Sequence, residues 1–353
     1  MSRKLRYGFT TGACAAAAAR GAALLLREGK PAGCAEIDLP AGFCAEFELH
    51  AENIEGEVAR AFVIKDAGDD PDVTHGVEVH ARVRRISSDG VDIRAGVGVG
   101  RVTKPGLAVP VGEAAINPVP RRMITDAVRE VLPEGGVEVT ISIPDGEARA
   151  EQTLNARLGI LGGLSILGTS GVVKPISHQA WTDTMAVAID VAIAAGLTTL
   201  VCSTGRSSER VALQEFDLPE EGFVMMGDHV AFAAEACHRK GLPHLLVAAQ
   251  FAKLVKIACG HRQTHVRHST LDLQQLVAWG HDAGLDHAEA KQLELAHTAR
   301  ELFLRYGPQH PLVRRVAAQA LTVLAGWAPG VSVGILLAGY DGKPAGRFGV
   351  CPD

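Results

Sequence analysis

The loop at residues 65–76 carries the densest group of side chains that could take part in chemistry. It places four aspartates, Lys65 and His75 in one short, turn-rich stretch. An acidic loop of this kind can accept hydrogen bonds from ribose hydroxyls, or pair with an amino or sulfonium cation. Its spacing lacks the central glycine and the terminal glutamate of a calcium loop. Surface turns closed by aspartate side chains are the alternative interpretation.

A glycine-rich segment at residues 155–171 sets hydroxyl groups among aliphatic side chains. Such a segment suits a wall that lies against a flat apolar ligand and offers backbone amides to its polar edge. A mobile linker between domains is the alternative, although the embedded isoleucine and leucine residues argue against a solvated one. A second glycine run, at residues 95–100, is followed by Pro105 rather than by a helix, so the dinucleotide-binding pattern is not met.

Polar residues also follow three apolar strands in the C-terminal half. Residues 203–206 come directly after a predicted strand and open a helix, and residues 227–229 and Gln250 follow the next two strands. Ligands collect at this carboxyl edge of an open parallel sheet. Helix amides together with Arg206 would suit a carboxylate or a phosphate there.

Two further patterns concern possible metal binding and covalent catalysis. His261, His265 and His268 have a spacing that would place three imidazoles roughly on one face of a helix, where they could bind zinc. Exposed or capping histidines are the alternative, because no cysteine or carboxylate is firmly placed beside them. Cys14 follows a predicted helix start that could lower its pKa, but no local histidine partner is identifiable. No Gly-x-Ser-x-Gly elbow is present.

Residues 9–26 predict the first helix and a turn in front of it. Thr10, Thr11 and Gly12 supply capping hydroxyls and a flexible turn, and an alanine run follows. Alanine on every face lets backbone or ligand approach closely, and free amides at the helix start favour an anionic group. The turn is therefore a candidate binding site, with a tightly packed core helix as the alternative.

Hydrophobic periodicity predicts two domains of different architecture. Residues 1–150 are expected to form an α+β domain with the alanine-rich helix and a mixed sheet. Residues 151–353 are expected to form the glycine-rich connection and a three-layer, Rossmann-like α/β domain with a mainly parallel sheet. The boundary should fall within residues 145–180. The expected strands are 35–39, 45–49, 58–64, 77–86, 91–93, 137–143, 199–202, 223–226, 244–248 and 331–337. The expected later helices are 117–132, 182–195, 207–215, 229–240, 271–284, 287–306 and 310–326.

Composition excludes several classes of protein. The 353 residues are 47% hydrophobic and 21% charged, which is typical of a globular chain. A net charge of -5 without a long basic block argues against nucleic-acid partners. The apolar runs are too short for a membrane helix or a convincing signal peptide. Seven cysteines without a CxxC pair indicate reduced thiols and a cytoplasmic location.

The ordered series of motifs resembles the CbiD family of cobalamin biosynthesis. The runs that carry the resemblance are residues 8–12 with the alanine helix, 65–76, 96–106, 111–121 and 155–171. Weaker matches at residues 203–206, 227–228 and 264–265 extend it over essentially the whole chain. The sequence departs from the family pattern at residues 251–254, where relatives commonly carry a glycine before the lysine.

The resemblance implies that the protein transfers a methyl group from S-adenosylmethionine to C1 of cobalt-precorrin-5B, a contracted tetrapyrrole. An electron-rich ring carbon would attack a sulfonium methyl in line, so alignment and exclusion of water supply most of the acceleration. No protein nucleophile is needed. Cobalt is carried by the substrate, and no protein-bound metal is expected.

The resemblance also suggests roles for individual residues. The acidic residues Asp66, Asp69 and Asp72 would lie near the cationic donor, together with the turn at Thr10, Thr11 and Gly12. If a base is required, His75 or Asp228 would supply it. We expect Gly12→Val to abolish turnover while leaving the fold largely intact. The residues expected to bind the tetrapyrrole are Arg101, Asn117, Arg121, Asn155, Arg157, Gly162, Gly168, Thr169, Ser170, Ser203, Thr204, Gly205, Arg206 and His265, the last of which could face the cobalt.

Two other classes of function are open at this point. A carrier protein would bind the tetrapyrrole without chemistry, and a zinc-dependent hydrolase would rest on the histidine cluster. Neighbouring enzymes of the cobalamin pathway and a second copy of this chain are further expected partners. The sequence leaves open whether the substrate already holds cobalt.

Overall fold

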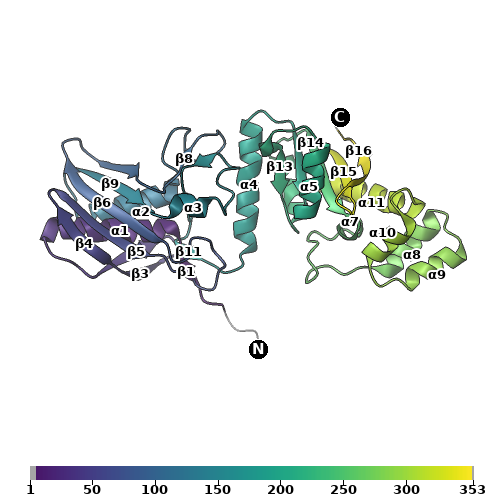
Figure 1. The fold of residues 1–353 in the computed structure, drawn as a ribbon, viewed down its shortest axis with the longest axis horizontal. Coiled ribbons are helices and arrows are strands. Elements are labelled where there is room, and N and C mark those ends of the chain that lie inside the picture. Colours follow the sequence, from purple (N-terminus) through teal and green to yellow (C-terminus); the bar gives the residue numbers. More distant parts are fainter. Residues whose placement is uncertain (1–4, 352–353) are drawn as a thin grey trace. The chain divides into compact units, whose positions relative to one another are not determined.

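The computed structural model describes residues 5–351 and divides the chain into two compact units (Figure 1). The first unit ends at His178 and the second begins at Gln179. This division lies within the expected interval 145–180 but later than residue 150. The physical reason is that the glycine-rich segment is bonded to the first unit, where the Gly12 amide donates to the Leu167 carbonyl at 3.0 Å. The expected mixture of helices and sheets is confirmed.

A five-stranded mixed sheet forms the frame of the first unit. Its order is β4 (His50–Glu55), β5 (Val58–Ile64), β6 (Glu78–Ile86), β9 (Gly136–Ser142) and β7 (Val91–Ala95). Neighbours are antiparallel except β7 and β9, which run parallel. Alternate residues of β5 and β6 are small and buried, as expected of a strand that covers a core with one face.

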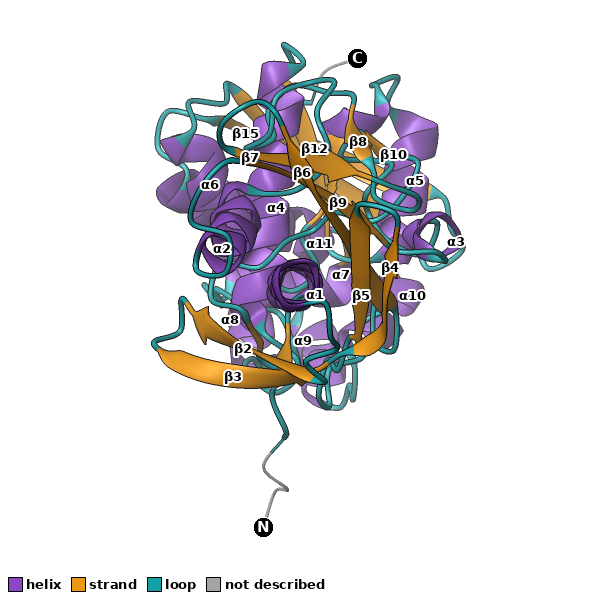
Figure 2. Ribbon diagram, turned by 90° about the vertical axis from the view of Figure 1, so that its left-hand side faces the viewer, coloured by secondary structure: helices purple, strands orange, loops and turns teal. Residues whose placement is uncertain are grey.

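Helix α1 (Thr11–Glu28) lies against this sheet and is buried on all sides. Figure 2 shows α1 end-on, between the sheet and the separate hairpin β2 (Cys34–Leu39) and β3 (Phe43–Glu48). Helix α2 (Pro118–Arg129) packs beside it. The alanines of α1 are fully buried because only methyl groups fit between so many close neighbours. The alanines are therefore packed in the core, and contact of the preceding turn with a ligand is a separate prediction.

Short ribbons join the glycine-rich segments of the first unit. Strand β1 (Gly8–Phe9) pairs with β11 (Val172–Val173), and β8 (Arg101–Val102) pairs with β10 (Ile160–Leu161). Where the short helix α3 (Gly146–Ala150) begins, three glycines cross. A Cβ on Gly146 or Gly163 would lie 2.1 or 2.2 Å from the Gly98 carbonyl oxygen. No side chain can be accommodated at this crossing.

The second unit has a five-stranded sheet in the order β13, β12, β14, β15, β16. The first four strands are parallel, and β16 is antiparallel to β15. Their bounds are β13 (Phe223–Met225), β12 (Thr199–Ser203), β14 (His244–Gln250), β15 (Ser332–Ala338) and β16 (Pro344–Gly349). The helices are α4 (His178–Ala194), α5 (Arg206–Glu215), α6 (Val230–Arg239), α7 (Phe251–Ala258), α8 (Leu273–Asp282), α9 (His287–Glu294), α10 (Ala299–Tyr306) and α11 (Pro311–Trp327), with a 3-10 turn at Glu220–Gly222.

Helices cover both faces of this sheet. Along β12, Leu200 and Cys202 pack into a cluster with α6 and α11, whereas Val201 packs into a separate cluster with α5. Strand side chains alternate between faces, so the two clusters lie on opposite sides. No helix in residues 5–351 combines the length and apolar character needed to cross a membrane.

Several elements differ from the sequence-based expectation. The expected helix 287–306 is two helices, because Thr298 caps a new helix by accepting the Glu301 amide. Helix α7 was not among the helices assigned from the apolar pattern; it follows β14 directly, with Gln250 as both the last residue of the strand and the N-cap of the helix. Strands β4 and β16, which bury few side chains, were also missed.

The close packing of α1 leads to a first prediction. Ala16→Leu places three extra carbon atoms where the side chain is fully buried, and should lower the free energy of unfolding by about 1–3 kcal/mol or more. Ala318→Leu, the same change at an exposed position of α11, is the control and should be nearly neutral. Urea unfolding of both variants measures the difference. Equal stability of the two variants would contradict the packing described for α1.

Candidate functional site

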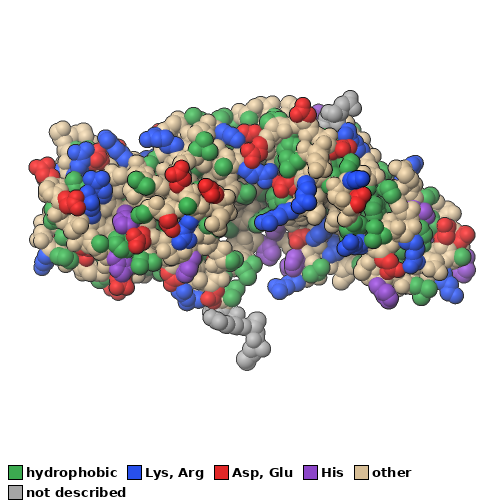
Figure 3. Space-filling model, in the orientation of Figure 1, with side chains coloured by type: hydrophobic (Ala, Val, Ile, Leu, Met, Phe, Trp, Pro, Cys, Tyr) green, Lys and Arg blue, Asp and Glu red, His purple; other side chains and the backbone are tan. Residues whose placement is uncertain are grey.

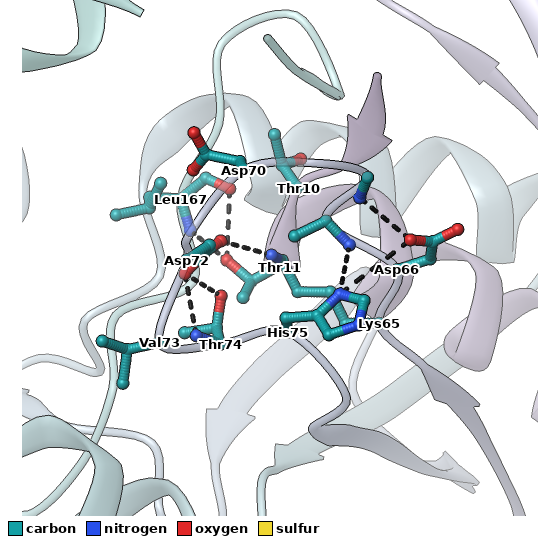
Figure 4. Close-up of polar contacts among 12 residues, drawn as sticks. Thr10, Thr11, Lys65, Asp66, Asp70, Asp72, Val73, Thr74, His75 and Leu167 are labelled. Atoms are coloured by element: carbon teal, nitrogen blue, oxygen red, sulfur yellow. Dashed lines mark hydrogen bonds and ion pairs between the residues drawn. The ribbon is translucent and has the colours of Figure 1, made fainter. Parts of the chain in front are cut away.

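The acidic loop of the first unit is organised by one buried ion pair (Figure 4). Lys65 is only 1% exposed, and its Nζ donates to Asp72 Oδ2 at 2.5 Å. Asp72 Oδ1 accepts from the amide and hydroxyl of Thr74 at 2.8 and 2.7 Å. Burial raises the pKa of Asp72, but Lys65 and Thr74 outweigh this and leave it below its usual range. Asp72 is therefore a charged anchor of the loop.

The other aspartates of the loop also have partners within the chain. Both guanidinium nitrogens of Arg6 donate to Asp66, at 2.5 and 2.8 Å. These hydrogen bonds lower the pKa of Asp66 to about 2. The Arg6 amide donates to Asp69 Oδ2 at 2.8 Å, and the Ile176 amide donates to Asp70 Oδ1 at 2.8 Å. The loop is thus fastened to distant segments by the carboxylates expected to face a ligand, and their contact with a donor stays a prediction.

His75 is half-exposed and bonded to the same loop. Its Nδ1 accepts the Ala67 amide at 3.1 Å, so the neutral ring carries its proton on Nε2. To act as a base, His75 would have to give up that hydrogen bond. Its assignment as a base stays a prediction that this bond disfavours.

The start of α1 uses its own amides within the protein. Thr10 Oγ1 accepts the Ala13 amide at 3.2 Å, and Thr11 Oγ1 accepts the Leu167 amide at 3.0 Å. The Gly12 amide is bonded to Leu167 as well. The expectation of free amides at this helix start is therefore wrong, because the Gly12 and Ala13 amides already donate to acceptors within the protein. Contact of Thr10, Thr11 and Gly12 with a ligand stays a prediction.

Two further expectations for this region need correction. A Cβ on Gly12 would lie 2.7 Å from Pro120 Cγ and 3.1 Å from the Leu167 oxygen, so Gly12→Val would disturb the fold. Burial raises the pKa of Cys14 to about 12. This outweighs the expected lowering by the helix start, and Cys14 is an inert core thiol.

The residues expected to bind the tetrapyrrole in the first unit lie on its crossing glycine-rich segments. Arg101 is exposed, and its Nη1 donates to the Gly112 carbonyl at 2.7 Å. Arg121 Nε donates to the Ile116 carbonyl at 2.9 Å, and Asn155 Nδ2 to the Gly163 carbonyl at 3.2 Å. Arg121 and Asn155 thus support the backbone around the segments, whereas Arg101 projects from them.

The remaining expected residues in the first unit differ in their accessibility. Gly162 and Thr169 are exposed, whereas Asn117 and Arg157 are half-buried. Ser170 Oγ donates to the Val172 carbonyl at 3.2 Å. A Cβ on Gly168 would lie 2.5 Å from the Thr10 side chain, so Gly168 permits a close approach to the start of α1.

Exposed aliphatic side chains on these segments were not anticipated from the sequence. They share the surface of the glycine-rich part of the first unit. They are Val97, Val111, Leu154, Leu161 and Leu167. Large exposed apolar groups gathered on a few adjoining loops mark a binding surface more often than scattered ones do. The feature of the sequence that could have indicated their exposure was their position beside glycines.

The second unit gathers its expected residues at the carboxyl edge of the sheet. The Ser203 carbonyl accepts the amides of Met226 and Gly227 at 3.0 and 3.2 Å. The Thr204 amide donates to the Ala248 carbonyl at 3.0 Å. The ends of β12, β13 and β14 are therefore joined, as a parallel sheet requires.

Asp228 ties two of these connections together. It forms an ion pair with Lys253, and the Thr264 hydroxyl donates to its Oδ1 at 2.6 Å. Burial raises the pKa of Asp228, but these two donors outweigh it and leave the pKa lowered. A carboxylate with a lowered pKa is a weak base. Asp228 as a base therefore stays a prediction, one that its surroundings disfavour.

Two lysines of α7 were missed as parts of this edge. Lys253 contacts Asp228, and Lys256 Nζ donates to the Thr264 carbonyl at 2.9 Å. Burial, helped by the nearby Lys253 charge, lowers the pKa of Lys256. Their spacing of three on one helix face was the available signal.

The three histidines do not share a helical face, so the zinc interpretation loses its geometric basis. His261, His265 and His268 follow α7 in an irregular loop, and His265 Nδ1 accepts the Arg267 amide at 3.2 Å. Within residues 5–351 no group of histidine, cysteine and carboxylate side chains is placed to hold a metal ion. Figure 3 shows basic and histidine side chains near one another on the visible face of the second unit.

Comparison with known proteins identifies the family. The chain matches the family model CbiD over residues 1–175 and the model for the CbiD C-terminal domain over residues 263–348. It is 51% identical to the cobalt-precorrin-5B C(1)-methyltransferase of Geobacter metallireducens, over 96% of this chain and 98% of the relative. The chain belongs to the CbiD family.

Other members of the CbiD family match in the same way. The relative of the same name from Geobacter sulfurreducens is 53% identical, over 96% of this chain and 97% of its own length. A crystal structure of the cobalamin biosynthesis protein CbiD from Archaeoglobus fulgidus is 32% identical. That match covers 73% of this chain and 81% of the other, with a TM-score of 0.39.

The buried ion pair of this CbiD-family chain leads to a second prediction. Asp72→Asn leaves the Lys65 cation buried without a counter-charge, and should lower the free energy of unfolding by about 3–5 kcal/mol. Lys65→Met combined with Asp72→Asn removes both charges and should recover most of that loss. Urea unfolding compares the two variants. A double variant as unstable as the single one would show that the charge on Lys65 is not the cause.

The inert state of Cys14 leads to a third prediction. In the native protein at about pH 8, iodoacetamide should label the exposed Cys34 and Cys44 but leave Cys14 unmodified. Peptide mass mapping after short labelling measures this, and labelling in denaturant is the control. Rapid native modification of Cys14 would overturn its assignment as a core thiol.

Proposed function

We propose that this chain is a cobalt-precorrin-5B C(1)-methyltransferase that uses S-adenosylmethionine as methyl donor. The observation that carries the proposal is the full-length identity of about one half to relatives with that name. The match extends over both units of the chain. The reaction is C-methylation of a ring carbon in cobalamin biosynthesis.

The surface of the first unit supports a tetrapyrrole as the substrate. A tetrapyrrole is flat and apolar on its faces and carries carboxylates at its rim. The exposed aliphatic side chains at Val97, Leu161 and Leu167 suit the faces, and the exposed Arg101 suits a rim carboxylate. We therefore place Arg101 among the substrate contacts, with Arg121 and Asn155 supporting the backbone around them.

The protein has to align the two reactants and shield them from water, and none of its side chains has to act as a nucleophile. S-adenosylmethionine supplies an electrophilic methyl group, and the ring carbon supplies the electron pair. A new carbon–carbon bond forms as the sulfonium–methyl bond breaks, and the donor leaves as neutral S-adenosylhomocysteine. Cys14, buried with a raised pKa, takes no part as a nucleophile. Alignment of the two reactants is the main contribution that we assign to the protein.

Several expectations from the sequence remain proposals. They comprise the donor contacts of the acidic loop, a base at His75 or Asp228, a cytoplasmic location and the cobalt-bound state of the substrate. Contacts with neighbouring pathway enzymes and a homo-oligomer belong with them. We also propose that the second unit has a Rossmann-like fold. Its parallel strands with helices on both faces support this.

A labelled-donor assay tests the proposed reaction. Purified protein with methyl-labelled S-adenosylmethionine and cobalt-precorrin-5B should transfer label to the tetrapyrrole at C1. Binding of the tetrapyrrole without label transfer would favour the carrier alternative instead. Metal analysis after dialysis tests the hydrolase alternative, which requires stoichiometric zinc.

The exposed arginine gives a fourth prediction. Arg101→Gln removes a cation from the proposed substrate surface, and should raise the KM for the tetrapyrrole about tenfold or more, because charge-assisted hydrogen bonds contribute about 1.5–3 kcal/mol. The KM for S-adenosylmethionine should stay within about twofold, since we assign Arg101 to the tetrapyrrole and not to the donor. Arg314→Gln, at an exposed position of α11, is the control. An unchanged tetrapyrrole KM would remove Arg101 from the substrate contacts.

A further inference from the structure

Helix α5 begins at the carboxyl edge of the second unit with unused hydrogen-bond donors. Its N-cap is Gly205, which has no side chain to cap it. In the part of the chain that the structure describes, the amides of Arg206, Ser207 and Ser208 have no acceptor. The first amides of a helix carry a partial positive charge, so this end favours an anion.

Ser203 provides independent evidence that a hydrogen-bond partner is missing at this position. Its side chain is only 1% exposed, and its Oγ has no hydrogen-bond partner among residues 5–351. Leaving a buried hydroxyl without a partner is unfavourable. Since β12 side chains alternate, Ser203 points to the same face as Val201, which packs against α5. The unpartnered hydroxyl is therefore directed to the side where the free amides lie.

The space at the N-cap is open. A Cβ on Gly205 would meet nothing within 4 Å. The backbone of Gly205 is extended, with φ of 172°, a conformation that any residue adopts. Glycine is thus not required here for folding, and its absence of a side chain keeps the approach to the amides clear.

The charges around this helix start also suit a carboxylate. Arg206, the first residue of α5, is exposed and has no ion-pair partner among the described residues. Asp228, at the neighbouring strand end, is neutralised by Lys253. Glu209 lies in the first turn of α5 and has an interaction of its own within the chain. The donors available at this helix start are three amides, the Ser203 hydroxyl and the Arg206 guanidinium.

We propose that the start of α5, with Ser203, binds the α-carboxylate of the methyl donor's methionyl group. This inference rests on the proposed methyl transfer and assigns the donor to the carboxyl edge of the second sheet. The acidic loop of the first unit is a weaker candidate, because its carboxylates already have partners within the chain. The carboxylate would give Ser203 Oγ the acceptor that it lacks.

Two substitutions separate binding from folding. Ser203→Ala removes a hydroxyl that has no partner, so stability should stay the same or rise, while the Kd for S-adenosylmethionine should rise about tenfold. Gly205→Val fills the open space, and should raise that Kd more than about tenfold at unchanged stability. Binding is measured by calorimetry on the full chain, and stability by urea unfolding.

Matched controls come from the same unit. Ser208→Ala removes a hydroxyl that does have a partner, the Gly205 carbonyl at 2.9 Å, and should lower stability. Gly326→Val adds a side chain in open space on α11, and should leave binding unchanged. Decarboxylated S-adenosylmethionine should bind the original protein weakly, and Ser203→Ala should not weaken it further.

The outcomes distinguish this inference from the proposed function. Methyl transfer, with the KM for S-adenosylmethionine, is measured in parallel. One outcome is that the unsubstituted protein transfers methyl groups while Ser203→Ala and Gly205→Val keep its Kd and KM for S-adenosylmethionine. That result would overturn the assignment of the donor carboxylate to α5 and leave the proposed function intact. If the original protein neither binds S-adenosylmethionine nor transfers a methyl group, the proposed function fails, and this inference fails with it.

Discussion

The burial of α1 over residues 11–23, where only Arg20 is partly exposed, is the constraint on which the first unit depends. A sheet, a hairpin and α2 all contact one helix whose surface consists mainly of methyl groups. Backbones can approach this closely only because alanine occupies so little space. The same closeness at the start of α1 brings in the glycine-rich segment, whose Leu167 bonds to Thr11 and Gly12. The candidate substrate surface is therefore positioned by the core rather than by flexible loops.

The second unit positions its polar groups by a different principle. Its parallel strands end at one edge, so residues far apart in the chain meet there without a dedicated scaffold. Asp228, Lys253 and Thr264 form a charged cluster that links β13 with α7 and the following loop. That cluster has its hydrogen bonds satisfied, whereas Ser203 does not. The contrast separates the side chains that hold the edge together from the one hydroxyl to which we assign a ligand.

The sequence located most buried elements, whereas the hydrogen-bond partners of the polar side chains could not be predicted from it. Alternation and apolar runs located β5, β6, β12 and β15, since burial on a sheet leaves a regular pattern. The junction of β14 with α7 was missed because no loop separates them: Gln250 is both the last residue of the strand and the N-cap of the helix. The acidic loop looked like a ligand site, but its partner Arg6 lies sixty positions away from Asp66, and no local pattern shows such a pairing. Likewise the amides of α1 looked free, although the Leu167 carbonyl accepts the Gly12 amide and Thr10 Oγ1 accepts the Ala13 amide.

The crossing of Gly98, Gly146 and Gly163 limits how this chain can change over generations. The Gly98 carbonyl occupies the space that a side chain on Gly146 or Gly163 would need, and the Ile143 carbonyl occupies the space that a side chain on Gly98 would need. A mutation at one position gains nothing from a compensating mutation at the others, because none of them has atoms left to remove. All three positions therefore require glycine. If the three codons are randomised, the folded variants should almost all carry glycine at each of them.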